Sequence, residues 1–156
     1  MTINELKSKK VGVLGFGHEG QALVRYLSKH QIPINVFDKK TQSEMNANQL
    51  SIIAEHKFQT FLGENYLDNL GEMEVVFKSP GINLSDQIKQ TLKEKEIFLT
   101  SQTAWFFKHC PSKIIGITGT KGKGTTSSLL FEILKASQFP HKVYITGNIG
   151  KDSPLD

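Results

Sequence analysis

Short apolar runs recur through the first hundred residues and predict the strands of a sheet. Most of these runs are apolar at every position, which is typical of strands that are buried on both faces. Residues 58–61 instead alternate apolar and polar side chains, which predicts a strand at the edge of the sheet. The predicted strands are 11–14, 34–37, 58–61, 75–77 and 97–99.

The stretches between these runs predict helices and loops. Apolar residues at helical spacing indicate helices over 21–29 and 84–95, and a shorter helix is expected over 65–70. The polar segment 41–49 predicts a loop or a short exposed helix. Alternating strands and helices indicate an α/β fold, in which right-handed crossovers build a parallel, Rossmann-like sheet over residues 1–100.

Residues 101–156 predict a linker and the beginning of a second domain. A short helix is expected over 102–109, and it carries Trp105, Phe106 and Phe107. A platform for stacking nucleic-acid bases would need these rings exposed, whereas large aromatic side chains are more often buried. We therefore expect them to pack between the two domains.

The second domain is expected to open with another α/β unit. The pattern predicts a strand at 114–118, a helix over 125–137 and a strand at 143–145, followed by a glycine-rich turn at 146–150. If the two strands are parallel neighbours, this turn lies beside the residues that follow the first strand. So small a unit cannot bury much core, and we expect the sequence to be a piece of a longer protein.

Composition and charge narrow the class of protein. The formal net charge is +4, and the lysines are scattered among acids, which does not favour a nucleic-acid partner. The single cysteine, Cys110, cannot form an internal disulfide. Residues 1–5 lack the apolar core expected of a signal peptide, and no apolar run is long enough to cross a bilayer. We expect a cytoplasmic monomer without a membrane partner.

The first candidate site follows the first predicted strand. Residues 15–20, with the sequence GFGHEG, lie between that strand and a helix, and the next strand ends at Asp38. This arrangement is typical of a nucleotide-binding βαβ unit. Asp38 could bind a ribose hydroxyl, and Lys39 or Lys40 could bind a 2′-phosphate, although another nucleotide could use the same parts.

Further candidate residues surround this turn. His18 and Glu19 stand at its mouth, where they either contact a diphosphate or base or remain ordinary exposed loop residues. The Ser-Pro-Gly sequence at 79–81 is expected at the carboxyl end of a strand, where open parallel sheets bind their ligands. Gly81 would let the backbone approach a ligand closely.

The second candidate site is the glycine-rich stretch after the strand at 114–118. A strand, glycines and the start of a helix leave backbone N–H groups free to bind an anion. Lys123 could contact the β and γ phosphates of a nucleotide, and the hydroxyls of Thr125 and Thr126 could bind Mg²⁺. Two residues, rather than four, separate Gly119 from Gly122. The alternative is an ordinary glycine turn with a solvated lysine.

The stretch GTKGKGTT at 119–126 resembles the ATP loop of the Mur ligase and folylpolyglutamate synthetase superfamily. The nucleotide-binding domain in front of it, the sequence SPGI at 79–82 and the sequence TGNIG at 146–150 are similar to the Mur ligases, and most closely to those that add D-glutamate. The resemblance implies that the first domain binds the UDP part of a muramoyl substrate. It implies that residues 101–156 begin the central ATPase domain.

The resemblance also assigns residues to ligands. Contacts with the UDP substrate fall on His18, Glu19, Asp38, Lys39, Lys40, Gly81 and Asn148. ATP binding falls on Gly119, Thr120, Lys121, Gly122, Lys123, Gly124, Thr125 and Thr126, with Lys123 as the catalytic residue and Thr125 as the Mg²⁺ ligand. Lys39 and Lys40 stand where the family often has a hydroxyl residue and an arginine.

The implied activity is an ADP-forming, ATP-dependent amide ligation in peptidoglycan precursor synthesis, the pathway that supports cell shape and division. Its implied substrates are UDP-N-acetylmuramoyl-L-alanine and D-glutamate, joined through an acyl phosphate, with this piece inactive alone. The open alternatives are another Mur ligase such as the L-alanine-adding enzyme, a protein with an NAD(P)-binding Rossmann domain, and a non-catalytic UDP-sugar-binding protein.

Overall fold

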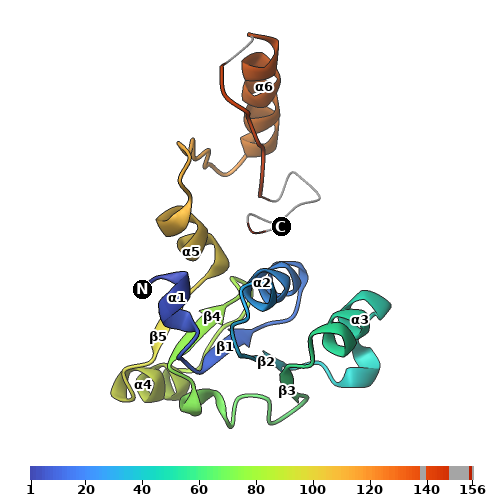
Figure 1. Cartoon of the computed structure of the whole chain (residues 1–156), viewed down its shortest axis with the longest axis vertical. Helices are drawn as coiled ribbons and strands as arrows, with labels where there is room; N and C mark the ends of the chain where they lie inside the picture. The colour runs from blue at the N-terminus through green and yellow to red at the C-terminus, as the bar shows by residue number, and fades with distance from the viewer. Residues whose placement is uncertain (138–139, 148–154, 156) are drawn as a thin grey trace.

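A five-stranded parallel sheet forms the centre of the chain in the computed structural model, which describes residues 1–137, 140–147 and 155. The strand order is β3-β2-β1-β4-β5, as Figure 1 shows. The strands are β1 (Val11–Leu14), β2 (Ile34–Asp38), β3 (Gln59–Leu62), β4 (Val75–Lys78) and β5 (Phe98–Thr100). The predicted parallel α/β sheet is therefore confirmed, with the alternating segment at an edge.

Helices connect the strands and cover the sheet (Figure 1). The α-helices are α1 (Ile3–Leu6), α2 (His18–Lys29), α3 (Ala47–His56), α4 (Asp86–Glu94), α5 (Gln102–His109) and α6 (Lys123–Ala136). Two short 3₁₀ helices, η1 (Gln42–Glu44) and η2 (Leu70–Glu72), lie in the connections. Helix α2 begins three residues earlier than its apolar pattern predicts, because Gly17 is its N-cap.

The two faces of the sheet carry separate apolar clusters, because successive side chains of a strand point to opposite faces. One face packs against α2 and α5 through Val11, Val13, Val36, Val75 and Phe77, together with Leu23, Leu27 and Trp105. The other face packs against the α4 side through Leu14, Phe37 and Val76, together with Leu70, Leu84 and Leu92. Burial on both faces explains why β1 and the first three residues of β4 are apolar.

Two helices differ from the sequence pattern. The helix predicted over 65–70 is wrong, because i to i+3 hydrogen bonds such as Asp68 N to Asn65 O (3.1 Å) form turns there, and η2 follows. Helix α3 extends well beyond the polar segment. It begins with a capping box in which Asn46 and Gln49 bond reciprocally, and it ends at Lys57, which has a positive φ of 49°.

The segment after α5 is organised differently from the sheet domain. Helix α6 confirms the helix predicted over 125–137, but the strands predicted at 114–118 and 143–145 are wrong, since neither is a strand in the structure. A strand needs a neighbour to accept its backbone hydrogen bonds, and neither segment pairs with another among the described residues. Figure 1 draws α6 apart from the sheet, and α6 buries none of its side chains.

Helix α5 binds the sheet domain through one aromatic side chain. Trp105 is 2% exposed and packs edge to face on Phe77, whereas Phe107 is 55% exposed. The expectation that all three rings pack between two domains is therefore wrong for Phe107, because the α5 face that meets the sheet is too narrow for adjacent residues to share. Among the residues described, no helix is long and apolar enough to cross a membrane.

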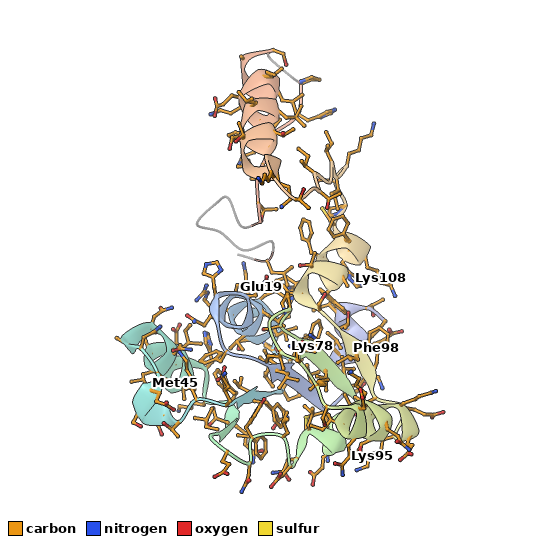
Figure 2. The ribbon with its side chains drawn as sticks, turned by 180° about the vertical axis from the view of Figure 1, so that it is seen from behind. Glu19, Met45, Lys78, Lys95, Phe98 and Lys108 are labelled. Carbon is orange, nitrogen blue, oxygen red and sulfur yellow. The ribbon has the colours of Figure 1, made fainter. Side chains whose placement is uncertain are left out.

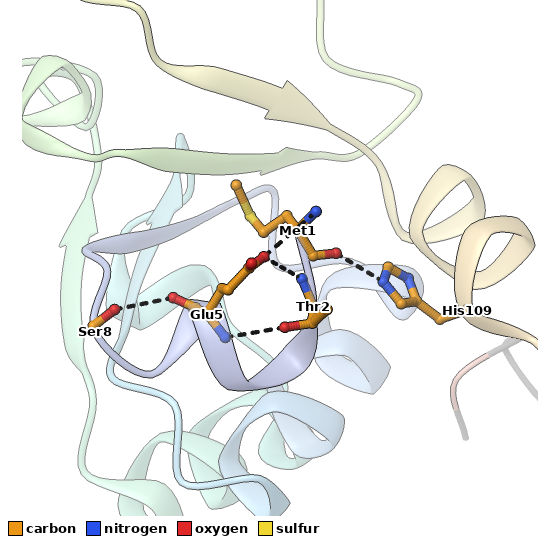
Figure 3. Close-up of polar contacts among 5 residues, drawn as sticks. All are labelled: Met1, Thr2, Glu5, Ser8 and His109. Carbon is orange, nitrogen blue, oxygen red and sulfur yellow. Dashed lines mark hydrogen bonds and ion pairs between the residues drawn. The ribbon is translucent and has the colours of Figure 1, made fainter.

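The N-terminus closes onto the end of α5, as Figure 3 shows. His109 stacks on Trp105, and its two ring nitrogens lie 2.8 Å from Trp105 O and 3.0 Å from Met1 O. A capping box between Thr2 and Glu5 orders α1 beside this contact. This contact between His109 and the N-terminus, the N-terminal clasp, holds α5 against the sheet domain.

Candidate functional site

The turns after β1 and β4 meet at the carboxyl edge of the sheet. Strand β1 lies between β2 and β4, so the chain order reverses at this point, which is where open parallel sheets bind ligands. Ser79 N donates to Leu14 O (2.9 Å), and Ser79 Oγ donates to Gly15 O (3.3 Å). The sequence-predicted motifs at 15–20 and 79–82 thus form one continuous surface.

Close packing explains two of the glycines in the first turn. Gly15 has a positive φ of 98°, and a Cβ there would lie 2.8 Å from both Ser79 Oγ and Ile82 Cδ1. A Cβ on Gly20 would lie 1.9 Å from Gly15 O. Gly17 has open space around it and serves as the N-cap of α2. The first and third glycines therefore allow the backbone and helix to approach, while Gly17 leaves the mouth of the turn open.

Asp38 fixes the turn through its carboxylate. Oδ2 accepts a hydrogen bond from Phe16 N (2.6 Å), and Oδ1 accepts one from Lys40 N (2.9 Å). A carboxylate has about four acceptor positions, so these two bonds leave capacity for a ligand hydroxyl or N–H. Lys39 and Lys40 follow Asp38 and are exposed. Asp38 is therefore a support of the turn as well as a candidate ligand contact.

Two buried side-chain amides bind the backbone carbonyl of Phe16. Gln49 Nε2 donates to Phe16 O (2.6 Å), and Gln21 Nε2 donates to it as well (3.3 Å). Asn48 Nδ2 in turn donates to Gln21 Oε1. The sequence analysis missed these residues, although the Asn46–Gln49 spacing is a capping-box signal that would have placed them on a helix. Phe16 is therefore hydrogen-bonded at both its backbone N–H and its backbone C=O.

His18 and Glu19 form the first turn of α2. His18 is exposed, whereas Glu19 Oε2 is buried and has no hydrogen-bond partner among the described residues. Glu19 lines a small cavity of about 10 Å³ together with Lys78, Ser79 and Gln102. Gln102 is 3% exposed, and both of its amide atoms likewise lack a partner in the described part of the chain. Gln102 adds α5 to the site, which no sequence signal indicated.

The turn after β4 is held by a lysine. Lys78 Nζ donates to Ile82 O (2.9 Å) and to Ser79 O (3.1 Å), and Figure 2 places Lys78 at the end of its strand below Glu19 on α2. Gly81 is exposed, with no atom within 4 Å of the position a Cβ would take. The backbone of Gly81 is therefore accessible to a ligand at this edge.

The loop 119–126 is ordered locally at the start of α6. Gly119 and Gly122 have positive φ values of 151° and 75°, and Gly122 is the N-cap of the helix. Lys123 Nζ donates back to Gly119 O, across the loop. Thr125 and Thr126 are exposed. Among the described residues, the loop lines neither the small cavity beside Glu19 nor a second cavity between α2 and α5.

The last predicted contact residue, Asn148, is outside the described residues. No cluster of three metal-ligating His, Cys, Asp or Glu side chains occurs in the part of the chain that the structure describes.

The acidic residues with a shifted pKa lie outside the candidate site. Among them, Glu44 is the nearest in sequence to Asp38. A hydrogen bond from the Thr41 backbone N–H lowers the pKa of Glu44. That bond stabilises η1 after Lys40.

Comparison with known proteins gives consistent matches. A family model described as Mur ligase MurD-like, N-terminal domain, matches residues 9–101. Proteins named UDP-N-acetylmuramoylalanine–D-glutamate ligase match over 145 residues at 36% identity in Clostridium acetobutylicum, over 147 residues at 37% in Clostridium kluyveri, and over 145 residues at 37% in Clostridium botulinum. Each alignment covers 93% of this chain, and the chain spans 31% of the length of each relative.

Proposed function

Since the chain belongs to the family of the Mur ligase MurD-like N-terminal domain, we propose that it binds the UDP part of UDP-N-acetylmuramoyl-L-alanine, the substrate of an ATP-dependent ligase that adds D-glutamate. The names of the relatives support this reaction. The matched residues 9–101 include both turns at the carboxyl edge of the sheet. The first domain is accordingly the substrate-binding part of the ligase.

One observation carries the proposed substrate site: the two glycine turns and Asp38 converge where the strand order reverses. The N-terminus of α2 follows the first glycine turn, and its positive dipole end favours a diphosphate. Asp38 and the exposed backbone at Gly81 are acceptors and donors for the uracil. Lys39 and Lys40 add positive charge beside them. His18 and Glu19 complete the mouth of the turn.

The loop 119–126 fits a nucleotide triphosphate. Positive φ values at Gly119 and Gly122 turn the chain into the start of α6, whose dipole favours phosphate. Lys123 would exchange the Gly119 carbonyl for phosphate oxygens, and the exposed hydroxyl of Thr125 would bind Mg²⁺. We assign ATP to this loop and UDP to the sheet edge. Asn148 remains a proposed contact with the UDP substrate.

The reaction is an amide ligation. When bound, ATP would transfer its γ-phosphoryl group to the substrate carboxylate, which leaves ADP and an acyl phosphate, while Mg²⁺ would neutralise charge on the phosphate oxygens. The amine of D-glutamate would then attack the acyl carbon, which forms the amide bond and releases phosphate and a proton. Lys123 stabilises the charge on the transferring oxygens. The first-domain residues hold the uridine end of the substrate, and this distant binding energy orients its carboxylate.

A thermal-shift and calorimetry series on the chain tests the substrate site. A ligand at a hundred times its dissociation constant should stabilise the sheet domain by about 2.7 kcal/mol. We expect stabilisation by UDP-N-acetylmuramoyl-L-alanine, weaker stabilisation by UDP-glucose, which shares only the UDP part, and none by NADPH at equal concentration. Stabilisation by NADPH alone would identify an NAD(P)-binding domain and contradict the proposal. Equal responses to both UDP-sugars would leave only a general UDP-sugar site and contradict the muramoyl assignment.

A further inference from the structure

The ammonium of Lys78 binds the backbone of the turn that follows β4. It is the last residue of that strand, and its ammonium donates to the carbonyl oxygens of Ile82 (2.9 Å) and Ser79 (3.1 Å). These two residues are the ends of the four-residue turn that presents Gly81. Hydrogen bonds from a charged donor are stronger than those between neutral groups. The ammonium therefore fixes both ends of the turn at once.

The same two residues hold the first glycine turn. Ser79 Oγ donates to Gly15 O, and the Ile82 side chain lies where a Cβ on Gly15 would be only 2.8 Å away. A shift of Ser79 or Ile82 would consequently move Gly15. Gly15 leads directly into Phe16, whose N–H is bonded to Asp38. Lys78 is thus connected to every backbone segment of the candidate UDP site.

We propose that Lys78 is a positioning residue for UDP-substrate binding, which holds turn 79–82 against turn 15–17 through its ammonium and does not touch the ligand. This inference rests on the proposed function. Without the ammonium, Ile82 O loses its partner and Ser79 O keeps only the Ile82 N–H (3.2 Å), so the turn rearranges to reach water. Gly81 and the start of α2 then no longer stand at a fixed separation.

The chain offers a matched control in Lys95. Its Nζ also donates to a backbone carbonyl, Gly71 O (3.1 Å), but this contact lies before β4 and β5, at the opposite edge of the sheet. Figure 2 labels both lysines and shows their separation. Lys95→Met removes the same chemical group and the same kind of bond. It leaves both glycine turns unchanged.

The test compares Lys78→Met, Lys78→Arg and Lys95→Met by calorimetry with UDP-N-acetylmuramoyl-L-alanine. Loss of bonds from a charged donor predicts that Lys78→Met binds about tenfold more weakly than the wild type. Lys78→Arg can donate to both carbonyls and should recover most of the affinity. Lys95→Met should bind as the wild type does. Wild-type affinity in Lys78→Met, or failure of Lys78→Arg to improve on it, would overturn the inference.

Amide hydrogen exchange on the unliganded proteins separates this inference from the proposed function. We expect faster exchange in Lys78→Met at Ile82 N, which donates to Ser79 O, and at Ser79 N, with β2 and β3 unchanged. If the wild type does not bind the UDP ligand, the proposed function fails, while the exchange rates still report whether Lys78 orders the turns. Unchanged exchange at both amides would contradict the positioning role. If Lys78→Met does not fold, the comparison of Lys78→Arg with Lys78→Gln decides in its place.

Discussion

Gly20 fits its position only because it has no side chain. Its Cα faces Gly15 O so closely that an added Cβ would lie 1.9 Å from that oxygen, and backbone atoms cannot move aside as a flexible side chain can. Gly17 is in the same turn but has open space around it. The two glycines therefore contribute differently, although the sequence motif gives them equal weight.

Gly20→Ala is expected to lower the free energy of unfolding by more than about 3 kcal/mol, because α2 must move away from the first turn. Gly17→Ala is the matched control, and it should cost less than about 1 kcal/mol, as expected for a glycine N-cap replaced by alanine. Urea denaturation of both variants measures the difference. Equal losses in the two variants would contradict the packing argument.

Glu74 links the starts of two central strands. Its Oε2 accepts from Lys10 N (2.9 Å), and its Oε1 accepts from Lys9 Nζ (2.9 Å). The bond from the Lys10 backbone N–H, followed by that from the Lys9 side chain, lowers the pKa of Glu74 below its ordinary value of 4.5. A lowered pKa in the folded state stabilises the protein above the unfolded-state pKa, and this contribution is lost as the pH falls through the folded-state value.

We predict that Glu74→Gln loses less stability on acidification than the wild type does. The glutamine variant lacks the charged carboxylate, so it should be less stable near neutral pH and should approach the wild type as the pH falls through the lowered folded-state pKa of Glu74. Chemical denaturation at a series of pH values measures the two curves. Glu64→Gln, at an exposed turn position, is the control and should follow the wild type. Parallel curves for Glu74→Gln and the wild type would refute the linkage.

At the scale of elements, α5 depends on a contact with the opposite end of its domain. His109 bonds Met1 O and Trp105 O and stacks on the Trp105 ring at 4.0 Å. The helix has only eight residues, so tertiary contacts must stabilise it. The clasp between the first residue and the last turn of α5 supplies one of them.

His109→Ala should lower the free energy of unfolding by about 1–2 kcal/mol through the loss of these bonds and the stacked ring. Lys108→Ala, at the adjacent exposed position, is expected to change it by less than about 0.5 kcal/mol. Thermal unfolding followed by Trp105 fluorescence provides the measurement. If the two variants unfold at the same temperature, the N-terminal clasp contributes nothing.

At the scale of the whole molecule, the two parts of the chain differ in burial. The core clusters consist of residues from Leu6 to Trp105, with Leu155 only packed against them. In α6, by contrast, Leu129 and Ile133 are 59% and 62% exposed. Nearly all of the apolar burial that stabilises the fold therefore lies in the sheet domain.

A chain shortened to residues 1–110 should keep the stability of the full chain to within about 1 kcal/mol, since removal of exposed side chains changes the free energy little. Circular dichroism and urea denaturation of both chains test this expectation. The heteronuclear NMR spectrum of the sheet domain should also be retained. A large loss of stability would mean that the segment after residue 110 packs on the sheet.

The agreement between sequence and structure is best for the buried strands. Runs such as 11–14 and 75–77 are apolar because both faces of the sheet are covered, and this signal is local. Agreement is poorer for α3, whose first turn is polar, and for residues 64–69, where turn residues outweigh the helical spacing. The contacts of Asp38 with Phe16 and of Ser79 with Gly15 join residues whose partners no local pattern specifies.

By itself the sequence determined the parallel α/β class, the glycine turns and their place after the strands, because these follow from periodicity and from the φ angles that glycine permits. Only the tertiary structure decided that Asp38, Ser79 and Gln49 support the first glycine turn, because these bonds join segments that are far apart in the sequence. It also decided that residues 114–118 and 143–145 are not strands here. A strand forms only where another segment can share its hydrogen bonds.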